Sequence, residues 1–223
     1  MQKHIVKIKS IENLTHNVLR IVTEKPPNYN FTPGQATEIC INKDGWKNET
    51  RPFTFTCLPD NDYLEFTIKT YPTHKGVTNE LLQLRINEEF ILGEVFGEIA
   101  YKGEGTFIAG GAGITPFISI LRFLKSKNEI GSNRLLFANK TKADIILETE
   151  LRDLLGINFI NILSDEKVSD YPHGYITEKF LKSTIPDLTK RIYLCGPEPM
   201  MEAVEQQLVN MGVDLKSIIK EIF

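Results

Sequence analysis

The chain is organised around the segment Thr106-Phe107-Ile108-Ala109-Gly110-Gly111-Ala112-Gly113-Ile114-Thr115-Pro116-Phe117. It predicts a short apolar strand, a glycine turn and the first turn of a helix, with Thr115 as N-cap and Pro116 at the first helical position. Glycines let the backbone approach a ligand, and a helix start offers free N–H groups and partial positive charge, which suits a pyrophosphate. A tight turn without any ligand has the same pattern, so both interpretations stay open here.

Downstream of this segment, strands and helices alternate. This alternation predicts a parallel sheet with helices on both faces. Strands are expected at 107–109, 134–138, 158–163, 191–195 and 217–223. One helix is expected to begin at Pro116, and further helices are expected at 146–155, 177–181 and 197–212.

Upstream, the chain follows a two-residue period instead. Tyr63-Leu64-Glu65-Phe66-Thr67-Ile68-Lys69 alternates apolar and polar side chains, and residues 18–22 and 38–41 are further strand candidates. Proline and glycine clusters separate these strands, and one helix is expected near 78–84. This pattern predicts a small barrel or sandwich. The boundary with the α/β half falls near 101–105, which gives domains of residues 1–102 and 103–223.

Composition narrows the class of protein. A length of 223 residues suits two domains, and a net charge of −3 argues against non-specific nucleic-acid binding. The three cysteines, Cys40, Cys57 and Cys195, are scattered, so no disulfide framework, iron–sulfur cluster or other metal site is predicted. No apolar run is long enough for a membrane span and no signal-peptide core is present, which favours a cytoplasmic setting.

Four motifs, in order along the chain, resemble the ferredoxin–NADP reductase superfamily. Arg51-Pro52-Phe53-Thr54 resembles its Arg-x-Tyr-Ser/Thr signature, and residues 110–116 resemble its pyridine-nucleotide loop. Cys195-Gly196-Pro197-Glu198-Pro199-Met200 and the terminal Glu221-Ile222-Phe223 are similar to two further family segments. The resemblance implies an N-terminal antiparallel Greek-key β-barrel that binds flavin, followed by a parallel-sheet α/β domain that binds NAD(P)H.

The flavin residues that the resemblance implies lie in the first half. Arg51 offers a bidentate cation to the flavin diphosphate, Phe53 a ring for the isoalloxazine, and Thr54 a hydrogen bond to flavin N5. The family usually has Tyr at Phe53, so a hydroxyl contact is lost while stacking survives. Further expected cofactor contacts come from Pro52, Lys69, Tyr71 and from Gly76, Val77 and Thr78, which resemble a diphosphate loop one residue longer in the family.

The nucleotide residues follow in the second half. Thr115 is expected near the nicotinamide end, and Cys195, directly before a Gly-Pro helix start, near nicotinamide C4. The other expected contacts are Gly110, Gly111, Ala112, Gly113, Pro116, Gly196, Pro197 and Met200. The segment 138–142, after the strand at 134–138, contains no acidic residue, and either Lys140 or Lys142 could meet a 2′-phosphate, which favours NADPH slightly.

The chain end has two open interpretations. By resemblance, Phe223 covers the flavin until nicotinamide displaces it, and Glu221 is a charged partner near Cys195 and Thr54. Both residues fit a plain strand end packed on the sheet equally well.

Together these features predict a flavin-dependent NAD(P)H oxidoreductase with FAD as the implied flavin. Thr54, Cys195, Glu221 and Phe223 are the expected catalytic residues. Because no cluster is expected on the chain, the electron acceptor would be a separate protein such as ferredoxin or flavodoxin, and a monomer is favoured. The alternatives are a reductase of free flavin or a small acceptor, a flavin-binding electron-transfer subunit of a larger complex, and an interaction module that keeps only the fold.

Overall fold

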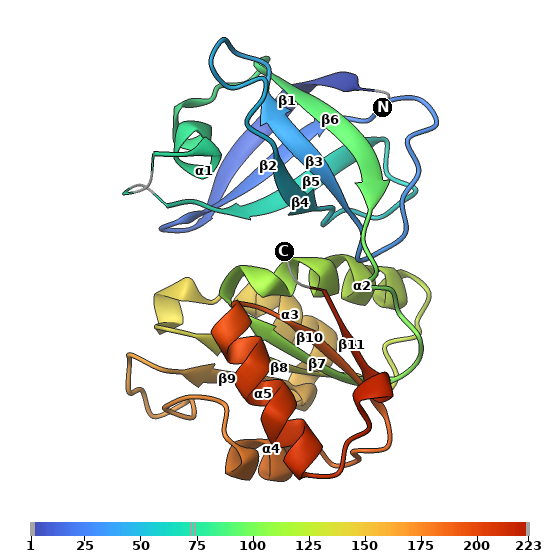
Figure 1. Cartoon of the computed structure of the whole chain (residues 1–223), viewed down its shortest axis with the longest axis vertical. Helices are drawn as coiled ribbons and strands as arrows, with labels where there is room; N and C mark the ends of the chain where they lie inside the picture. Colours follow the sequence, from blue (N-terminus) through green and yellow to red (C-terminus); the bar gives the residue numbers. More distant parts are fainter. Residues whose placement is uncertain (1–2, 72, 74, 222–223) are drawn as a thin grey trace.

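The computed structural model describes residues 3–71, 73 and 75–221. Two lobes lie one above the other in Figure 1, an all-β lobe from the first half of the chain and an α/β lobe from the second. The C-terminal strand ends between them.

The first lobe is a six-stranded antiparallel sheet in the order β4-β3-β6-β1-β2-β5. An antiparallel bridge between Phe55, just after β4, and Phe66 on β5 joins the two ends of this order, so the sheet closes into a barrel. Its elements are β1 (His4–Thr15), β2 (Val18–Glu24), β3 (Ala36–Ile41), β4 (Arg51–Thr54), β5 (Tyr63–Lys69), α1 (Val77–Glu80), η1 (Leu81–Gln83) and β6 (Glu89–Phe96).

The second lobe is a five-stranded parallel sheet in the order β11-β10-β7-β8-β9. The strand order changes direction between β7 and β10, the kind of point where open α/β sheets bind ligands beyond the strands' carboxyl ends. The elements are β7 (Gly105–Gly110), η2 (Gly111–Ile114), α2 (Thr115–Ser126), β8 (Arg134–Asn139), η3 (Lys142–Asp144), α3 (Glu148–Leu155), η4 (Gly156–Asn158), β9 (Phe159–Leu163), α4 (Glu178–Thr184), β10 (Arg191–Cys195), α5 (Glu198–Asn210), η5 (Leu215–Ser217) and β11 (Ile218–Lys220).

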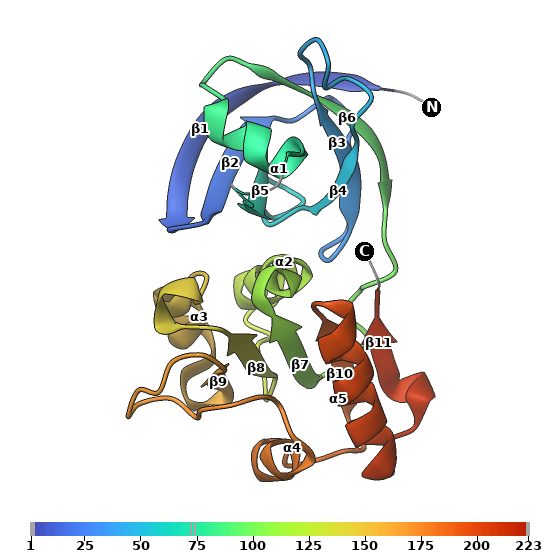
Figure 2. The ribbon, with the colours of Figure 1, turned by 60° about the vertical axis from the view of Figure 1, so that its left-hand side comes forward.

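Helices cover both faces of the parallel sheet. Helices α2 and α3 lie on the face toward the barrel, whereas α4 and α5 lie on the opposite face (Figure 2). The apolar core under α2 and α3 also takes in Val18 and Ile99 from the barrel side, so the two lobes share buried surface. The predicted fold class is confirmed.

Local details differ from the expectations. Thr115 is the first residue of α2 rather than its N-cap, because Ile114 already has helical backbone angles and the 3-10 turn η2 leads directly into the helix. The final strand covers only Ile218–Lys220, and α5 begins at Glu198 with Pro197 as its N-cap. In the described part of the chain, no helix is both long and apolar enough to cross a membrane.

Candidate active site

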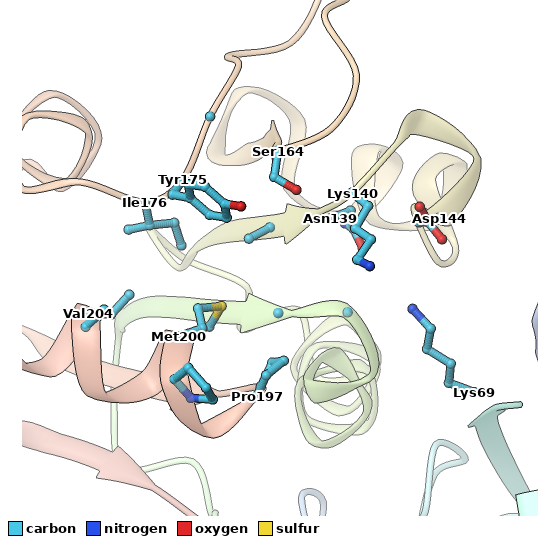
Figure 3. Close-up of a pocket in the computed structure, with 16 residues that line it drawn as sticks. Lys69, Asn139, Lys140, Asp144, Ser164, Tyr175, Ile176, Pro197, Met200 and Val204 are labelled. Carbon is cyan, nitrogen blue, oxygen red and sulfur yellow. The ribbon is translucent and has the colours of Figure 1, made fainter. Parts of the chain in front are cut away.

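A pocket of about 430 Å³ opens at the carboxyl ends of β7 and β8, beside the start of α5. Of the residues predicted for the nucleotide it gathers Gly110, Gly111, Lys140, Pro197 and Met200 (Figure 3). Lys69, a residue expected to contact the flavin, lines this pocket as well. The other lining residues are Ala138, Asn139, Asp144, Ser164, Gly174, Tyr175, Ile176, Pro199, Ala203 and Val204. The remaining predicted nucleotide residues, Ala112, Gly113, Thr115, Pro116, Cys195 and Gly196, do not line it.

The glycine turn has two different physical roles. At Gly110 a Cβ atom would lie 2.5 Å from Met200 Sδ, and at Gly113 it would lie 2.3 Å from the carbonyl oxygen of Cys195. Gly113 therefore needs to be glycine so that the turn can pack against the backbone of the β10–α5 connection, whereas at Gly110 the close neighbour is the flexible end of the Met200 side chain. Gly111 instead has φ +51°, and the nearest atom to a Cβ there is Lys69 Nζ at 3.9 Å. Its backbone faces open space at the pocket, as a phosphate cradle requires.

Positive charge enters the pocket from both lobes. Lys69 extends from the end of β5 in the barrel, and Lys140 follows β8. Figure 3 shows their ammonium ends directed at the same part of the pocket. The acidic neighbour Asp144 accepts hydrogen bonds at Oδ2 from the Thr141 backbone N–H at 3.0 Å and hydroxyl at 2.7 Å. Burial raises the pKa of Asp144, but these hydrogen bonds and the charges of Lys69 and His16 outweigh it, so the carboxyl stays anionic. Two cations beside an open glycine turn suit phosphate groups.

Asn139 provides the test of whether a polar ligand fits here. Its side chain is 8% exposed, and neither amide atom has a hydrogen-bond partner within the described residues. A buried amide without partners is costly, so the observation indicates that a ligand satisfies it. The exposed ring of Tyr175 and the apolar Ile176 and Met200 complete a lining suited to a planar base. NAD(P)H fits these residues.

The predicted flavin residues lie along the barrel edge that β4 forms. Arg51 and Pro52 are exposed, Phe53 is half-buried and Thr54 is buried. The Arg51 guanidinium donates to the Thr50 carbonyl at 2.6 Å and lies 3.8 Å from Glu49, so most of its donors remain available for a diphosphate. Gly76 is the N-cap of α1, and no side chain among the described residues caps this helix, which leaves N–H groups at its start. Tyr71 is 43% exposed. These groups fit an FAD diphosphate and ring.

Strand register and the C-terminal strand connect this edge to the second lobe. Ala36 on β3 pairs with Thr54 on one side and Phe96 on the other. Directly after Phe96, the backbone N–H of Glu98 donates to Glu221 Oε1 at 3.3 Å. Glu221 follows β11 and its charge acts on Cys195 at the end of β10. Glu221 thus links the barrel side to Cys195, whereas Thr54 lies on β4, with β3 between it and β6. Phe223 lies outside the described residues.

Cys195 and Glu221 have shifted protonation equilibria. Burial, with a smaller effect from the Glu221 charge, raises the pKa of the Cys195 thiol to about 12. Burial likewise raises the pKa of the Glu221 carboxyl. A helix start often activates a cysteine as a thiolate, but here the thiol is 3% exposed and stays protonated. Cys195 is therefore a neutral, small neighbour of the site.

Sequence comparison identifies both halves of the chain. The profile of the FAD-binding domain family matches residues 3–128, more than half of the chain, and the oxidoreductase NAD-binding domain matches residues 107–206. The chain belongs to the ferredoxin–NADP reductase superfamily. It combines the FAD-binding and NAD-binding domains of that superfamily, as the motifs predict.

Individual relatives extend this assignment. The chain is 27% identical over 188 residues to the 2-halobenzoate 1,2-dioxygenase electron transfer component of Burkholderia cepacia, covering 80% of this chain and 54% of that protein. It is 28% identical over 238 residues to NADH-cytochrome b5 reductase 2 of Emericella nidulans, covering 97% and 74%. The chain thus spans little more than half the length of the former. A ferredoxin NADP⁺ reductase from Neisseria gonorrhoeae with bound FAD and NADP has the same fold, with a TM-score of 0.87 at 18% identity and 99% and 98% coverage.

Proposed function

We propose that this superfamily member is a flavin-dependent NAD(P)H oxidoreductase with a flavin lobe of residues 1–102 and a nucleotide lobe of residues 103–223. When bound, the two cofactors supply hydride transfer from nicotinamide C4 to flavin N5 and a flavin that can pass single electrons on. The observation that carries the proposal is the position of Glu221. Its carboxylate accepts from the backbone N–H of Glu98, just past β6 of the barrel, while its charge acts on Cys195 at the end of β10.

The chain's own contribution is orientation. Arg51 and the start of α1 hold the diphosphate of FAD, Phe53 supports its ring, and Thr54 donates at N5. Gly110, Gly111 and Lys69 hold the nucleotide diphosphate, and Thr115 and Cys195 line the nicotinamide end. Holding two reactants in reacting geometry lowers the activation barrier by about 7–11 kcal/mol in favourable cases. This positioning is the main contribution of the protein to hydride transfer.

We propose NADPH as the preferred donor, because Lys140 follows β8 at the pocket, where its ammonium group can pair with a 2′-phosphate. The acceptor we propose is a separate electron-carrier protein of the ferredoxin or flavodoxin type. The dioxygenase electron transfer component among the relatives supports a second candidate, an electron-transfer subunit of an oxygenase system.

The test is anaerobic mixing of the FAD-loaded chain with NADPH or NADH while the visible flavin absorbance is recorded. We expect full bleaching, faster with NADPH, and a shift toward NADH in a K140A variant. Flavin that stays oxidised with both nucleotides would contradict the proposal. FAD retained through gel filtration excludes the free-flavin reductase alternative, and FAD lost there favours it.

A further inference from the structure

Arg122, two turns into α2, makes polar contacts with both lobes. Its Nη1 donates to Glu65 Oε1 on β5 of the barrel at 2.5 Å and to the Thr56 carbonyl at 2.7 Å. Its Nε and Nη2 form a fork to the Glu150 carboxylate on α3, at 2.6 and 2.8 Å. The guanidinium thus contacts the barrel and helix α3 of the second lobe at once.

The barrel end of this cluster is rigid and buried. The Glu65 side chain is 2% exposed and accepts from Arg20 on the neighbouring strand β2 at 2.7 Å and from the Thr56 hydroxyl at 2.9 Å. Burial raises the pKa of Glu65, but the charges and hydrogen bonds of Arg122 and Arg20 outweigh it and leave that pKa below its ordinary value. Glu65 is therefore a fixed anion to which α2 is attached.

The attachment points lie on the same two segments that carry the proposed reaction centre. The β4 residues Arg51–Thr54 run directly into Thr56 and Cys57, whose carbonyls accept from Arg122 and from the buried Ser119 hydroxyl at 3.1 Å. On the other side, α2 begins at Thr115, seven residues and about 10 Å before Arg122 along the helix axis. The hydrogen bonds of Arg122 and Ser119 therefore join the segment after β4 to helix α2, which begins at the glycine turn.

We propose that Arg122 is a positioning residue for the transfer step: by fixing α2 to Glu65 and Thr56, it sets the separation between the ring held by the barrel and the nicotinamide held at the α2 start. This inference rests on the proposed function. Buried ion pairs seldom add net stability but do fix one geometry, which is the property that such a role requires. Arg122 contacts neither cofactor pocket, so it acts through the elements it joins.

The experiment compares FAD-loaded R122M, R122K and E65Q with wild type by anaerobic stopped-flow. R152M is the control, because Arg152 pairs with Glu148 on the same α3 at 2.7 Å and does not reach the barrel. A misplacement near 1 Å costs on the order of 100-fold in rate. We therefore expect flavin reduction to slow about 10- to 100-fold in R122M and E65Q, with the KM for NAD(P)H nearly unchanged and the nicotinamide–flavin charge-transfer absorbance lost.

R122K keeps the charge but not the fork, so it should recover part of the rate and of the charge-transfer absorbance. R152M should behave as wild type. If R122M does not retain FAD, the S119A variant takes its place. It removes the hydrogen bond from the Ser119 hydroxyl to the Cys57 carbonyl, and its flavin-reduction rate and charge-transfer absorbance are compared with those of wild type.

The inference is overturned if the folded variants reduce flavin as fast as wild type with the same charge-transfer absorbance, which would leave Arg122 a role in stability only. Wild-type protein whose flavin is never reduced would instead overturn the proposed function, so the two failures are distinguishable.

Discussion

Replacing Gly113 with alanine tests the packing on which the nucleotide site depends. A Cβ atom there would lie 2.3 Å from the Cys195 carbonyl oxygen, 2.5 Å from its carbon and 2.6 Å from Gly196 Cα. All three are backbone atoms, so no side chain can rotate away. To reach an ordinary contact of 3.4 Å, the turn or the β10–α5 connection must move by the difference, 3.4 − 2.3 = 1.1 Å.

This displacement sets the expected loss of stability and the expected loss of flavin-reduction rate. Overpacking typically costs about 1–3 kcal/mol of unfolding free energy, offset by about 0.4–1 kcal/mol because alanine restricts the unfolded chain. We therefore expect G113A to be destabilised by roughly 1–2 kcal/mol. Because the shift moves the nucleotide turn against Cys195, flavin reduction by NAD(P)H should slow by up to about 100-fold.

Urea unfolding, FAD content and anaerobic flavin reduction measure these effects on one preparation. Gly93→Ala in β6 is the matched control, since its nearest neighbour is Glu38 Cβ at an ordinary 3.4 Å. G93A should match or slightly exceed wild-type stability and keep its rate, and G113A should keep its FAD. G113A that equals G93A in both stability and rate would refute the packing argument.

Three further predictions concern single groups. R51A should weaken FAD binding about 10- to 100-fold, as expected for one lost charged hydrogen-bonding partner, and should leave the melting of the apoprotein unchanged. Equilibrium dialysis measures the affinity for FAD, and an unaltered affinity would contradict the role assigned to Arg51. Cys195 should resist iodoacetamide in the native protein at pH 8 and react in urea. Because the pKa of its thiol is raised from 9 to about 12 in the folded protein, the stability that the thiol contributes is complete below pH 9 and is lost as pH rises toward 12. The C195A variant should lack this loss. The pKa of Glu65 is lowered in the folded protein, so its contribution to stability is present above pH 4.5 and is lost as pH falls below that value. E65Q should lower the free energy of unfolding by about 3–5 kcal/mol at neutral pH. A loss of stability that does not shrink in acid would argue against the buried anion.

Much of the fold could be predicted because its signals are local. The strand Arg191–Cys195 is bounded by charge on one side and Gly-Pro on the other, and Thr177 caps α4 as a helix start should. The first strand, His4–Thr15, gave no comparable signal. Only Val6 and Ile8 in it are buried, and two register shifts against β2 disturb its alternation.

The site was predicted less completely, for a physical reason. Residues such as Gly111 and Lys140 can be predicted from the sequence around them, whereas the three-dimensional structure is needed to place Asn139 and Tyr175 in the pocket. Tyr175 reaches the pocket because the loop after β9 returns through a bridge between Leu163 and His173. Arg122 and Glu65 are 57 residues apart, and nothing local in the sequence marks them as partners.

Flavin reduction by NAD(P)H carrying deuterium at one or the other face of nicotinamide C4 tests most directly whether the two lobes share one reaction centre. We predict a primary kinetic isotope effect on anaerobic flavin bleaching for one stereoisomer and none for the other, because a nicotinamide held in one orientation turns a single face of its ring to the flavin. Equal rates for both deuterated nucleotides and the unlabelled one, or flavin that never bleaches, would contradict direct transfer between the lobes.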